Sequence, residues 1–403
     1  METADVAVVG GGPAGAAAAI ELTRAGRSVV LIDKARFPRD KICGDGLTVG
    51  ALRLLERLGL DPVTVPSWRP AADVVVRSPA GHEATFRLPS GAGTYAVVAR
   101  RKELDAALLD RARAEGAKVH DGHAVVGAVE RADRVELDVE GLGIVQARYA
   151  IGADGMWSPL RKLLGVSTDG YRGEWHAFRQ YFAHVGPLAA SRLSVWFEPD
   201  LLPGYAWSFP LADGHANVGF GIQRDGDNLA RIRGMKELWP ALLQRPHIRA
   251  ALGPGAVPES PHRSWPIPAR VAAVRLTTGR TLFVGDAAAA TDALTGEGIG
   301  QALLTGVLSA EAIGTGGLDA GRTTAAYEGL VRHTLLHDHR MSALLVRTLA
   351  HRASADAEIR LADSNDWTRR HFTRWLFEDY PRSIITTPRR WHRGALSGPG
   401  AYR

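Results

Sequence analysis

The chain has 403 residues, a mass of 43.2 kDa and a hydrophobic fraction of 45%, which predict a globular protein of two or three packed domains. This composition excludes a wholly disordered chain or a fibre, and the single cysteine excludes an intrachain disulfide and a cysteine-based zinc site, so we expect no metal. The formal charge is +6, and the residues from Val331 onward hold 13 Arg against 7 Asp and Glu. The whole excess of positive charge therefore belongs to the C-terminal tail.

No targeting signal is evident in the sequence. The stretch Met1–Asp5 lacks the basic residues of a secretory signal, and no uncharged apolar run reaches the roughly 18–20 residues of a membrane-spanning helix. We therefore expect a cytoplasmic protein, with contact to the inner face of a membrane left open.

The first 33 residues predict a strand, a glycine turn, a helix and a second buried strand. The turn is Gly10-x-Gly12-x-x-Gly15, and Asp33 followed by Lys34 closes the second strand. Glycine lets the backbone approach a phosphate closely, the helix N-terminus offers free N–H groups, and the acid is placed to bind a ribose. This arrangement predicts a dinucleotide site.

The rest of the chain alternates between sheet and helix patterns. In chain order the sequence predicts short strands at 71–88, a helix at 101–115, a β-meander at 117–151, an antiparallel sheet at 171–223, a buried strand at 282–284 with a helix from about 297, and helices from 317 to about 376.

Two further glycine motifs follow predicted strands: Gly152-Ala153-Asp154-Gly155, and Gly285-Asp286 leading into Thr295-Gly296-Glu297-Gly298-Ile299. With the first turn they resemble the three fingerprints of the glutathione-reductase-type flavoproteins in their hydroxylase-like branch. The resemblance implies FAD, with the helix after the third fingerprint pointing its N-terminus at the isoalloxazine. The further cofactor contacts implied are Arg101, Asp154, Gly155, Gly285, Asp286, Gly296, Gly298 and Ile299.

The electron donor is left open by the sequence. No second GxGxxG stands between a strand and a helix, so NAD(P)H or another donor, including a donor protein, would dock transiently rather than occupy a domain of its own.

Three more stretches narrow the family. Pro38–Gly46 matches the PxxKxCGxG stretch of the geranylgeranyl reductase family, and Tyr205–Pro210 with Gly219 and Gly221 matches its YxWxFP…GxG motif. The stretch 374–381 is similar to actinobacterial members that act on quinone side chains. This resemblance covers nearly the whole chain and implies that reduced FAD hydrogenates C=C bonds of an isoprenoid, such as a geranylgeranyl or menaquinone-type chain.

The same stretches supply candidate catalytic residues. Alternate residues of a strand share a face, so Tyr205, Trp207 and Phe209 can line an apolar slot that excludes water. Cys43 lies on a loop expected near the flavin, where it either donates a proton, shapes the site, or simply packs as a small apolar residue. The candidate substrate contacts are Lys41, Gly44, Gly46, Arg179, Tyr181, Gly219 and Gly221.

The chain departs from the family pattern GDAAGxxxPxxGEGI at two positions, where Ala289 and Ala293 replace the Gly and the Pro. This departure, together with the shared hydroxylase-type FAD architecture, keeps an alternative open: an FAD-dependent monooxygenase or oxidase that tailors a specialised metabolite. A flavin-bound prenyl carrier or redox sensor is a third, non-enzymatic hypothesis.

The predicted fold class is α/β with three parts. A Rossmann-like FAD-binding domain would comprise 1–67, 95–170 and 275–316, an inserted antiparallel-sheet (α+β) substrate domain 68–94 and 171–274, and a C-terminal helical region 317–403. The basic, aromatic tail carries no known nucleic-acid motif. We expect a helical cap, either alone or with peripheral contact to anionic lipid, and a lipophilic small-molecule substrate.

Overall fold

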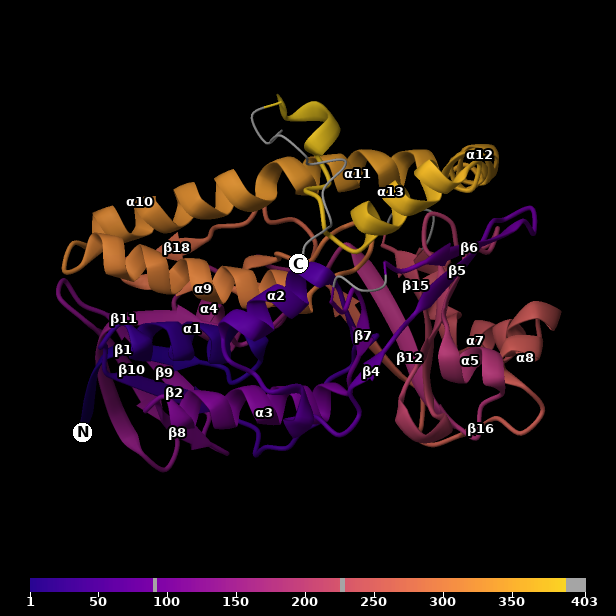
Figure 1. Cartoon of the computed structure of the whole chain (residues 1–403). Coiled ribbons are helices and arrows are strands. Elements are labelled where there is room, and N and C mark those ends of the chain that lie inside the picture. The colour runs from indigo at the N-terminus through magenta and orange to yellow at the C-terminus, as the bar shows by residue number, and fades with distance from the viewer. Residues whose placement is uncertain (90–92, 225–228, 389–403) are drawn as a thin grey trace.

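The computed structural model describes residues 1–89, 93–224 and 229–388. Figure 1 shows one sheet near the N-terminus, a second sheet on the opposite side, and the C-terminal helices lying across the top of both. The predicted fold class is confirmed: a Rossmann-type sheet, a largely antiparallel second sheet and a C-terminal helical region. The exact domain boundaries stay a prediction.

The first sheet has a parallel core in the order β19-β11-β1-β2-β8. Its strands are β1 (Glu2–Val9), β2 (Val29–Asp33), β8 (Lys118–Asp121), β11 (Gly143–Gly152) and β19 (Thr281–Phe283). An antiparallel meander is formed by β9 (Val125–Glu130), β10 (Val135–Val139) and β11, and β18 (Thr277–Thr278) pairs with β19. The meander predicted for 117–151 is thus confirmed only from β9 onward, because β8 pairs in parallel with β2. Helices cover this core, so its strands are continuous apolar runs, and Val6 to Val9 are buried.

Small residues allow two helices to pack closely over the parallel strands. The covering helices are α1 (Pro13–Arg24), α2 (Val49–Arg57), α3 (Arg101–Ala114), α4 (Pro159–Leu163) and α9 (Ile299–Gly316). A Cβ on Gly306 of α9 would overlap the carbonyl oxygen of Ala14, so α9 can lie this close to α1 only because glycine stands there. The N-termini of both helices border the same cavity, since Gly12 and Pro13 line it together with Gly298 and Ile299.

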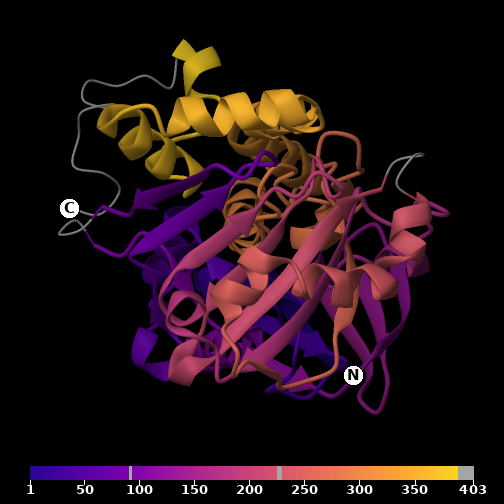
Figure 2. The ribbon, with the colours of Figure 1, turned by 90° about the vertical axis from the view of Figure 1, so that its right-hand side faces the viewer.

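The second sheet has the order β16-β12-β15-β14-β13-β5-β6, with β17 also paired to β12, and all its pairs are antiparallel except β13 with β5. Its strands are β5 (Asp73–Arg77), β6 (Glu83–Arg87), β12 (Trp175–Ala183), β13 (Leu193–Trp196), β14 (Ala206–Pro210), β15 (Ala216–Gln223), β16 (Val257–Pro258) and β17 (Arg263–Ile267). On one face pack α5 (Pro187–Ser191), α7 (Met235–Leu243) and α8 (Pro246–Leu252), preceded by α6 (Leu229–Arg233) (Figure 2). The opposite face of this sheet borders the cavity described below.

A small three-stranded sheet and five short helical turns complete the connections. The sheet has the order β3 (Gly46–Leu47), β7 (Val97–Val98), β4 (Arg69–Pro70). The turns are η1 (Pro62–Thr64), η2 (Ala212–Gly214), η3 (Gly285–Ala288), the π-helical η4 (Arg332–Leu336) and η5 (Ile384–Thr386).

The C-terminal helices lie across both layers: the first of them packs on α9, and the last packs on β6. They are α10 (Ala320–Val331), α11 (His337–Leu349), α12 (Arg352–Ala362) and α13 (Asp366–Leu376). The ring of Phe372 on α13 lies 4.8 Å from that of Phe86 on β6, centroid to centroid. Residues 389–403, which include Trp391 and four of the tail's arginines, lie outside the described residues.

Candidate active site

A cavity of about 620 Å³ lies where the carboxyl ends of the parallel strands meet the second sheet and the C-terminal helices. The predicted site residues line this cavity, except Gly15, Tyr181, Gly219 and Gly221. The wall opposite the glycine motifs is apolar and comes from strands β5 and β13 of the second sheet, with the residue after β13, and from α11, α12 and α13, with the residue after α13. These residues are Val74, Val76, Leu193, Val195, Phe197, Leu345, Leu349, Ile359, Phe372, Trp375, Leu376 and Phe377.

The first glycine turn has the geometry of a phosphate cradle. Gly10 has φ +109°, and a Cβ there would overlap the Ala153 carbonyl oxygen, so only glycine fits. A Cβ on Gly15 would likewise overlap the Gly10 carbonyl oxygen, which gives Gly15 a packing role beneath the cavity. No side chain caps the N-terminus of α1, and Asp33 Oδ2 accepts the Gly11 N–H at 2.7 Å.

Three cations surround this end of the cavity. Arg101 donates from Nε and Nη2 to Asp105 at 2.7 and 2.8 Å, and Arg39 donates to the same carboxylate at 2.8 Å. Lys41 Nζ lies 3.9 Å from the centroid of Trp265, and burial lowers the pKa of Lys41 to about 8. Such a set of donors suits an anionic ligand.

The second and third fingerprints approach the same space. Asp154 accepts the Ser158 hydroxyl at 2.6 Å and the Leu160 N–H at 2.8 Å, and burial raises its pKa. Asp286 lies 4.0 Å from Lys41 Nζ. Gly298 and Ile299 place the start of α9 at the cavity, where the positive end of the helix dipole favours negative charge.

The aromatic strand lies directly against the cysteine loop. Trp207 lies between Tyr205 and Phe209 with ring centroids 6.2 Å from each, and the Tyr205 hydroxyl donates to the Thr295 carbonyl oxygen. A Cβ on Gly44 or Gly46 would be 3.5 Å from the Phe209 ring. The two family motifs, more than 150 residues apart in sequence, therefore form one wall.

Cys43 lies on this loop as a partly buried thiol. Burial raises the pKa of Cys43, and the neighbouring Arg101 guanidinium opposes that shift. The thiol therefore stays protonated at neutral pH, which suits a proton donor and does not suit a thiolate nucleophile.

A buried polar cluster next to Cys43 contains the predicted Tyr181 and two residues that the sequence did not reveal, Asp45 and Asn217. Asp45 is fully buried, its Oδ2 accepts the Tyr181 hydroxyl at 2.6 Å and the Asn217 amide at 2.8 Å, and burial raises its pKa to about 6. Asn217 also donates to the Cys43 carbonyl oxygen at 2.8 Å and accepts the Trp207 indole N–H at 3.1 Å. The only sequence signal for Asp45 was its place as a polar residue between Gly44 and Gly46 of the cysteine motif. No local pattern in the sequence indicated Asn217.

The remaining predicted substrate residues lie in or behind this wall. Arg179 lines the cavity and donates to Asp40 at 2.8 Å, while its guanidinium lies 4.0 Å from the Tyr181 ring centroid. Gly219 and Gly221 are on β15 behind Trp207, and a Cβ on Gly219 would overlap the Trp207 ring. Tyr181 and the two glycines therefore lie behind the lining of the cavity and stay predictions as substrate contacts.

These residues fit FAD. The uncapped N-terminus of α1 can hold the pyrophosphate, Asp33 can hold a ribose hydroxyl, and the start of α9 can face the isoalloxazine.

Comparison with known proteins agrees with this geometry. Residues 3–304 match the FAD binding domain family. The chain is 35% identical over 351 residues to a menaquinone reductase of Mycolicibacterium smegmatis, covering 78% of this chain and 77% of the relative. It is 27% identical over 373 residues to a digeranylgeranylglycerophospholipid reductase of Methanosarcina acetivorans, covering 89% and 88%.

A solved structure shares the fold over nearly the whole chain. It is a geranylgeranyl bacteriochlorophyll reductase-like protein of Thermoplasma acidophilum, with a TM-score of 0.78 and 21% identity, covering 97% of this chain and all of that one. The fold and site thus define an FAD-dependent oxidoreductase, and FAD is its cofactor. Within that class, the chain belongs to the geranylgeranyl reductase family.

Within 1–89, 93–224 and 229–388, no helix combines the length and the apolar character needed to cross a bilayer.

Proposed function

We propose that this enzyme reduces C=C bonds in the isoprenoid chain of a lipid or quinone. The main support is that the flavin fingerprints and a long apolar wall, formed by the second sheet and the C-terminal helices, line the same cavity. The relatives named menaquinone reductase and digeranylgeranylglycerophospholipid reductase act on molecules that carry such chains. The apolar wall suits a polyisoprenoid because burial of its methyl and methylene groups provides the binding free energy.

The chemistry requires one hydride and one proton for each double bond. Reduced FAD supplies the hydride. We propose that Tyr205, Trp207 and Phe209 orient the alkene and exclude water, and that Cys43 Sγ donates the proton, supported by its raised pKa and its place beside the aromatic wall. Each reduced bond thus gains two hydrogen atoms.

We also propose that the residues of the three fingerprints hold FAD, and that NAD(P)H or a donor protein delivers electrons transiently. The cations Arg39, Lys41 and Arg101 at the cavity support the first part because FAD carries a pyrophosphate.

Peripheral contact with an anionic membrane is a further part of the proposal. Three large apolar side chains are exposed on successive C-terminal helices: Leu344 at 53%, Leu361 at 68% and Trp367 at 63%. The exposed arginines Arg352 and Arg360 lie on α12. Apolar side chains beside arginines are typical of surfaces that rest on anionic lipid, where the substrate resides.

The test is an anaerobic single-turnover experiment. The holoenzyme is reduced with dithionite and mixed with a menaquinone, a digeranylgeranyl lipid or geranylgeranyl diphosphate, with fully saturated analogues as controls. We expect flavin reoxidation and a product heavier by 2 Da for each reduced bond, with the unsaturated compounds alone.

If no unsaturated compound reoxidises the flavin, the proposal fails. A product heavier by 16 Da that requires O2 and NAD(P)H would instead support the monooxygenase alternative, which rests on the hydroxylase-type FAD architecture and on the replacement of the family Gly and Pro by Ala289 and Ala293.

A further inference from the structure

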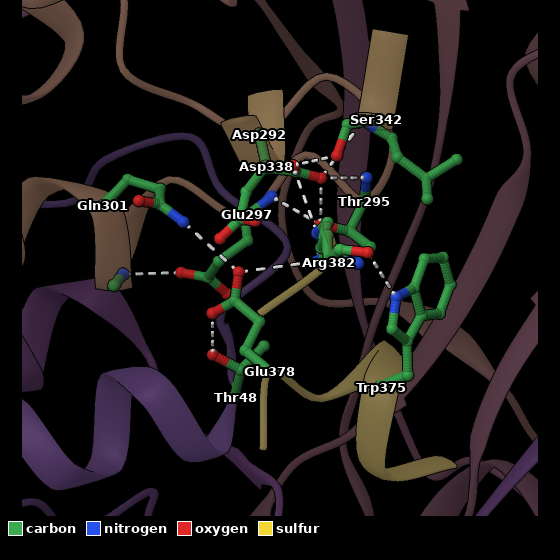
Figure 3. A network of polar contacts seen from close by, with 12 residues as sticks. Thr48, Asp292, Thr295, Glu297, Gln301, Asp338, Ser342, Trp375, Glu378 and Arg382 are labelled. Carbon is green, nitrogen blue, oxygen red and sulfur yellow. Dashed lines mark hydrogen bonds and ion pairs between the residues drawn. The ribbon is translucent and has the colours of Figure 1, made fainter. Parts of the chain in front are cut away.

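The segment that follows α13 returns to the flavin side of the molecule. The Val49 N–H donates to the Phe377 carbonyl oxygen at 3.0 Å, and the Thr48 hydroxyl donates to Glu378 Oε2 at 2.8 Å. Gln301, in the first turn of α9, donates to Glu378 Oε1 at 3.2 Å (Figure 3). The segment directly after α13 is therefore hydrogen-bonded to the starts of α2 and α9.

Arg382 extends from this segment into the loop before α9. Its side chain is 3% exposed, and its Nε lies 3.2 Å from Asp292 Oδ2. Its Nη2 donates to the Thr295 hydroxyl at 3.1 Å and to Glu378 Oε1 at 3.4 Å (Figure 3). One guanidinium thus joins the C-terminal segment to two positions of the loop.

Asp292 determines the shape of that loop. Its Oδ1 accepts the backbone N–H groups of Leu294 and Thr295 at 3.1 and 2.9 Å, and its own N–H donates to the Glu297 carbonyl oxygen at 2.9 Å. Its Oδ2 accepts the Ser342 hydroxyl of α11 at 2.5 Å. The loop lines the cavity from Leu294 to Gly298, so the orientation of Asp292 sets where the start of α9 faces the flavin site.

The cluster holds more carboxyl groups than cations. The titratable and charged groups that influence Arg382 are Asp292, Glu297, Asp338 and Glu378, and Tyr205 and His339 also border Asp292. Burial raises the pKa of Glu297 to about 8, and the adjacent carboxyl of Glu378 contributes to that shift while Arg382 opposes it. Removal of the guanidinium would leave buried carboxyl groups without a compensating charge.

We propose that Arg382 is a positioning residue of the flavin site, which fixes the loop before α9 through Asp292 and Thr295 and balances the buried carboxyl groups beside it. The C-terminal segment is on this basis a part of the cofactor site as well as a wall of the substrate cavity, because Trp375 and Phe377 line that cavity and the Trp375 indole N–H donates to the Arg382 carbonyl oxygen at 3.1 Å. The proposal depends on FAD binding and is independent of the substrate's identity.

The test compares FAD binding and flavin reduction potential in the wild-type protein, Arg382→Met and Arg382→Lys. We expect Arg382→Met to weaken FAD binding about tenfold, the effect of losing charged hydrogen bonds in the loop. We also expect a more negative midpoint potential, because the loop would no longer hold the positive end of the α9 dipole toward the flavin site. Arg382→Lys keeps the positive charge but loses the bidentate guanidinium geometry, so its FAD affinity and midpoint potential should lie between those of the wild type and Arg382→Met.

Two further variants control for the loss of an arginine in general and for misfolding. Arg370 is exposed on α13, so Arg370→Met is the matched loss of an arginine and should leave both quantities at wild-type values. The double variant Glu378→Gln with Arg382→Met removes one buried carboxylate, so it should recover part of the FAD affinity lost in Arg382→Met. If Arg382→Met alone does not fold, the double variant is compared with the wild type in its place. Wild-type affinity and potential in the Arg382 variants, or equal losses in Arg370→Met, would overturn the proposal.

Discussion

Asp45 in the cavity wall and Ala289 after the third fingerprint both hold left-handed backbone conformations. Asp45 has φ 64°, which directs its carboxyl group inward to Tyr181 and Asn217. Ala289 has φ 49° and ψ 41°, a conformation that costs an L-residue about 1–2 kcal/mol and that glycine adopts freely. The glycine of the family pattern is thus explained by the backbone, and this chain tolerates alanine there in spite of the strain.

Asp45 should make the stability of the protein depend on pH. Its pKa is about 6 in the folded protein against an ordinary 3.8, so the folded state binds the proton more tightly. The stabilisation is fully present below pH 3.8 and is lost as pH rises through about 6, an effect of about 3 kcal/mol. We expect Asp45→Asn to remove this part of the pH dependence in urea unfolding between pH 4 and 7, while Asp366→Asn on α13 serves as the exposed control. Parallel profiles for the wild type and Asp45→Asn would contradict this assignment.

At the scale of elements, the pairing of β14 with β15 sets the position of the central tryptophan. Trp207 lies directly opposite Gly219, and Gly219 in turn lies opposite Arg179 of β12. The space beside the Gly219 backbone is filled by the indole of Trp207 and the carbonyl oxygen of Phe178. The missing side chain at Gly219 therefore makes room for Trp207.

Two glycines of the same strand should respond differently to alanine. A Cβ on Gly219 meets rigid neighbours, so Gly219→Ala should lower the free energy of unfolding by about 1–3 kcal/mol. No atom lies within 4 Å of a Cβ on Gly221, and Gly221→Ala should change it by less than about 0.5 kcal/mol. Chemical denaturation of both variants measures the difference, and equal effects would contradict the packing account.

The sequence predicted secondary-structure elements and the residues that share one face of a strand better than it predicted contacts between side chains far apart in the chain. Alternation along β14 placed Tyr205, Trp207 and Phe209 on one face, and all three line the cavity. The contacts of Asp45 with Asn217 and of Asp292 with Arg382 join residues far apart in the chain, and a single Asp, Asn or Arg carries no local pattern that reveals its partner. Only the assembled fold brings such pairs together.

At the scale of the whole molecule, the C-terminal helices have two different sides. Leu349, Ile359 and Phe372 line the cavity, whereas Leu361 and Trp367 are exposed on the same layer. Of the tail's charge, four arginines lie in 389–403, outside the described residues. One side of this layer thus borders the cavity, and the other presents the side chains on which the proposed membrane contact rests.

The exposed side chains supply the corresponding prediction. The double change Leu361→Glu with Trp367→Glu should weaken cosedimentation with phosphatidylglycerol-containing vesicles by about tenfold or more, because two apolar anchors become acidic. Leu188→Glu, at an exposed leucine of α5, is the control and should bind as the wild type does. Equal losses in both variants, or no binding by the wild type, would refute membrane contact through these helices.

The ion pair of Asp292 with Arg382 also bears on the order in which the protein is made. Synthesis proceeds from the N-terminus at about 5–20 residues per second, so the glycine turn, β19 and Asp292 leave the ribosome well before Arg382 does. A nascent chain can therefore assemble the parallel sheet while its buried carboxyl groups still lack their guanidinium. A chain cut off before Arg382 would keep the glycine turn and Asp292 but would lack the guanidinium that pairs with Asp292.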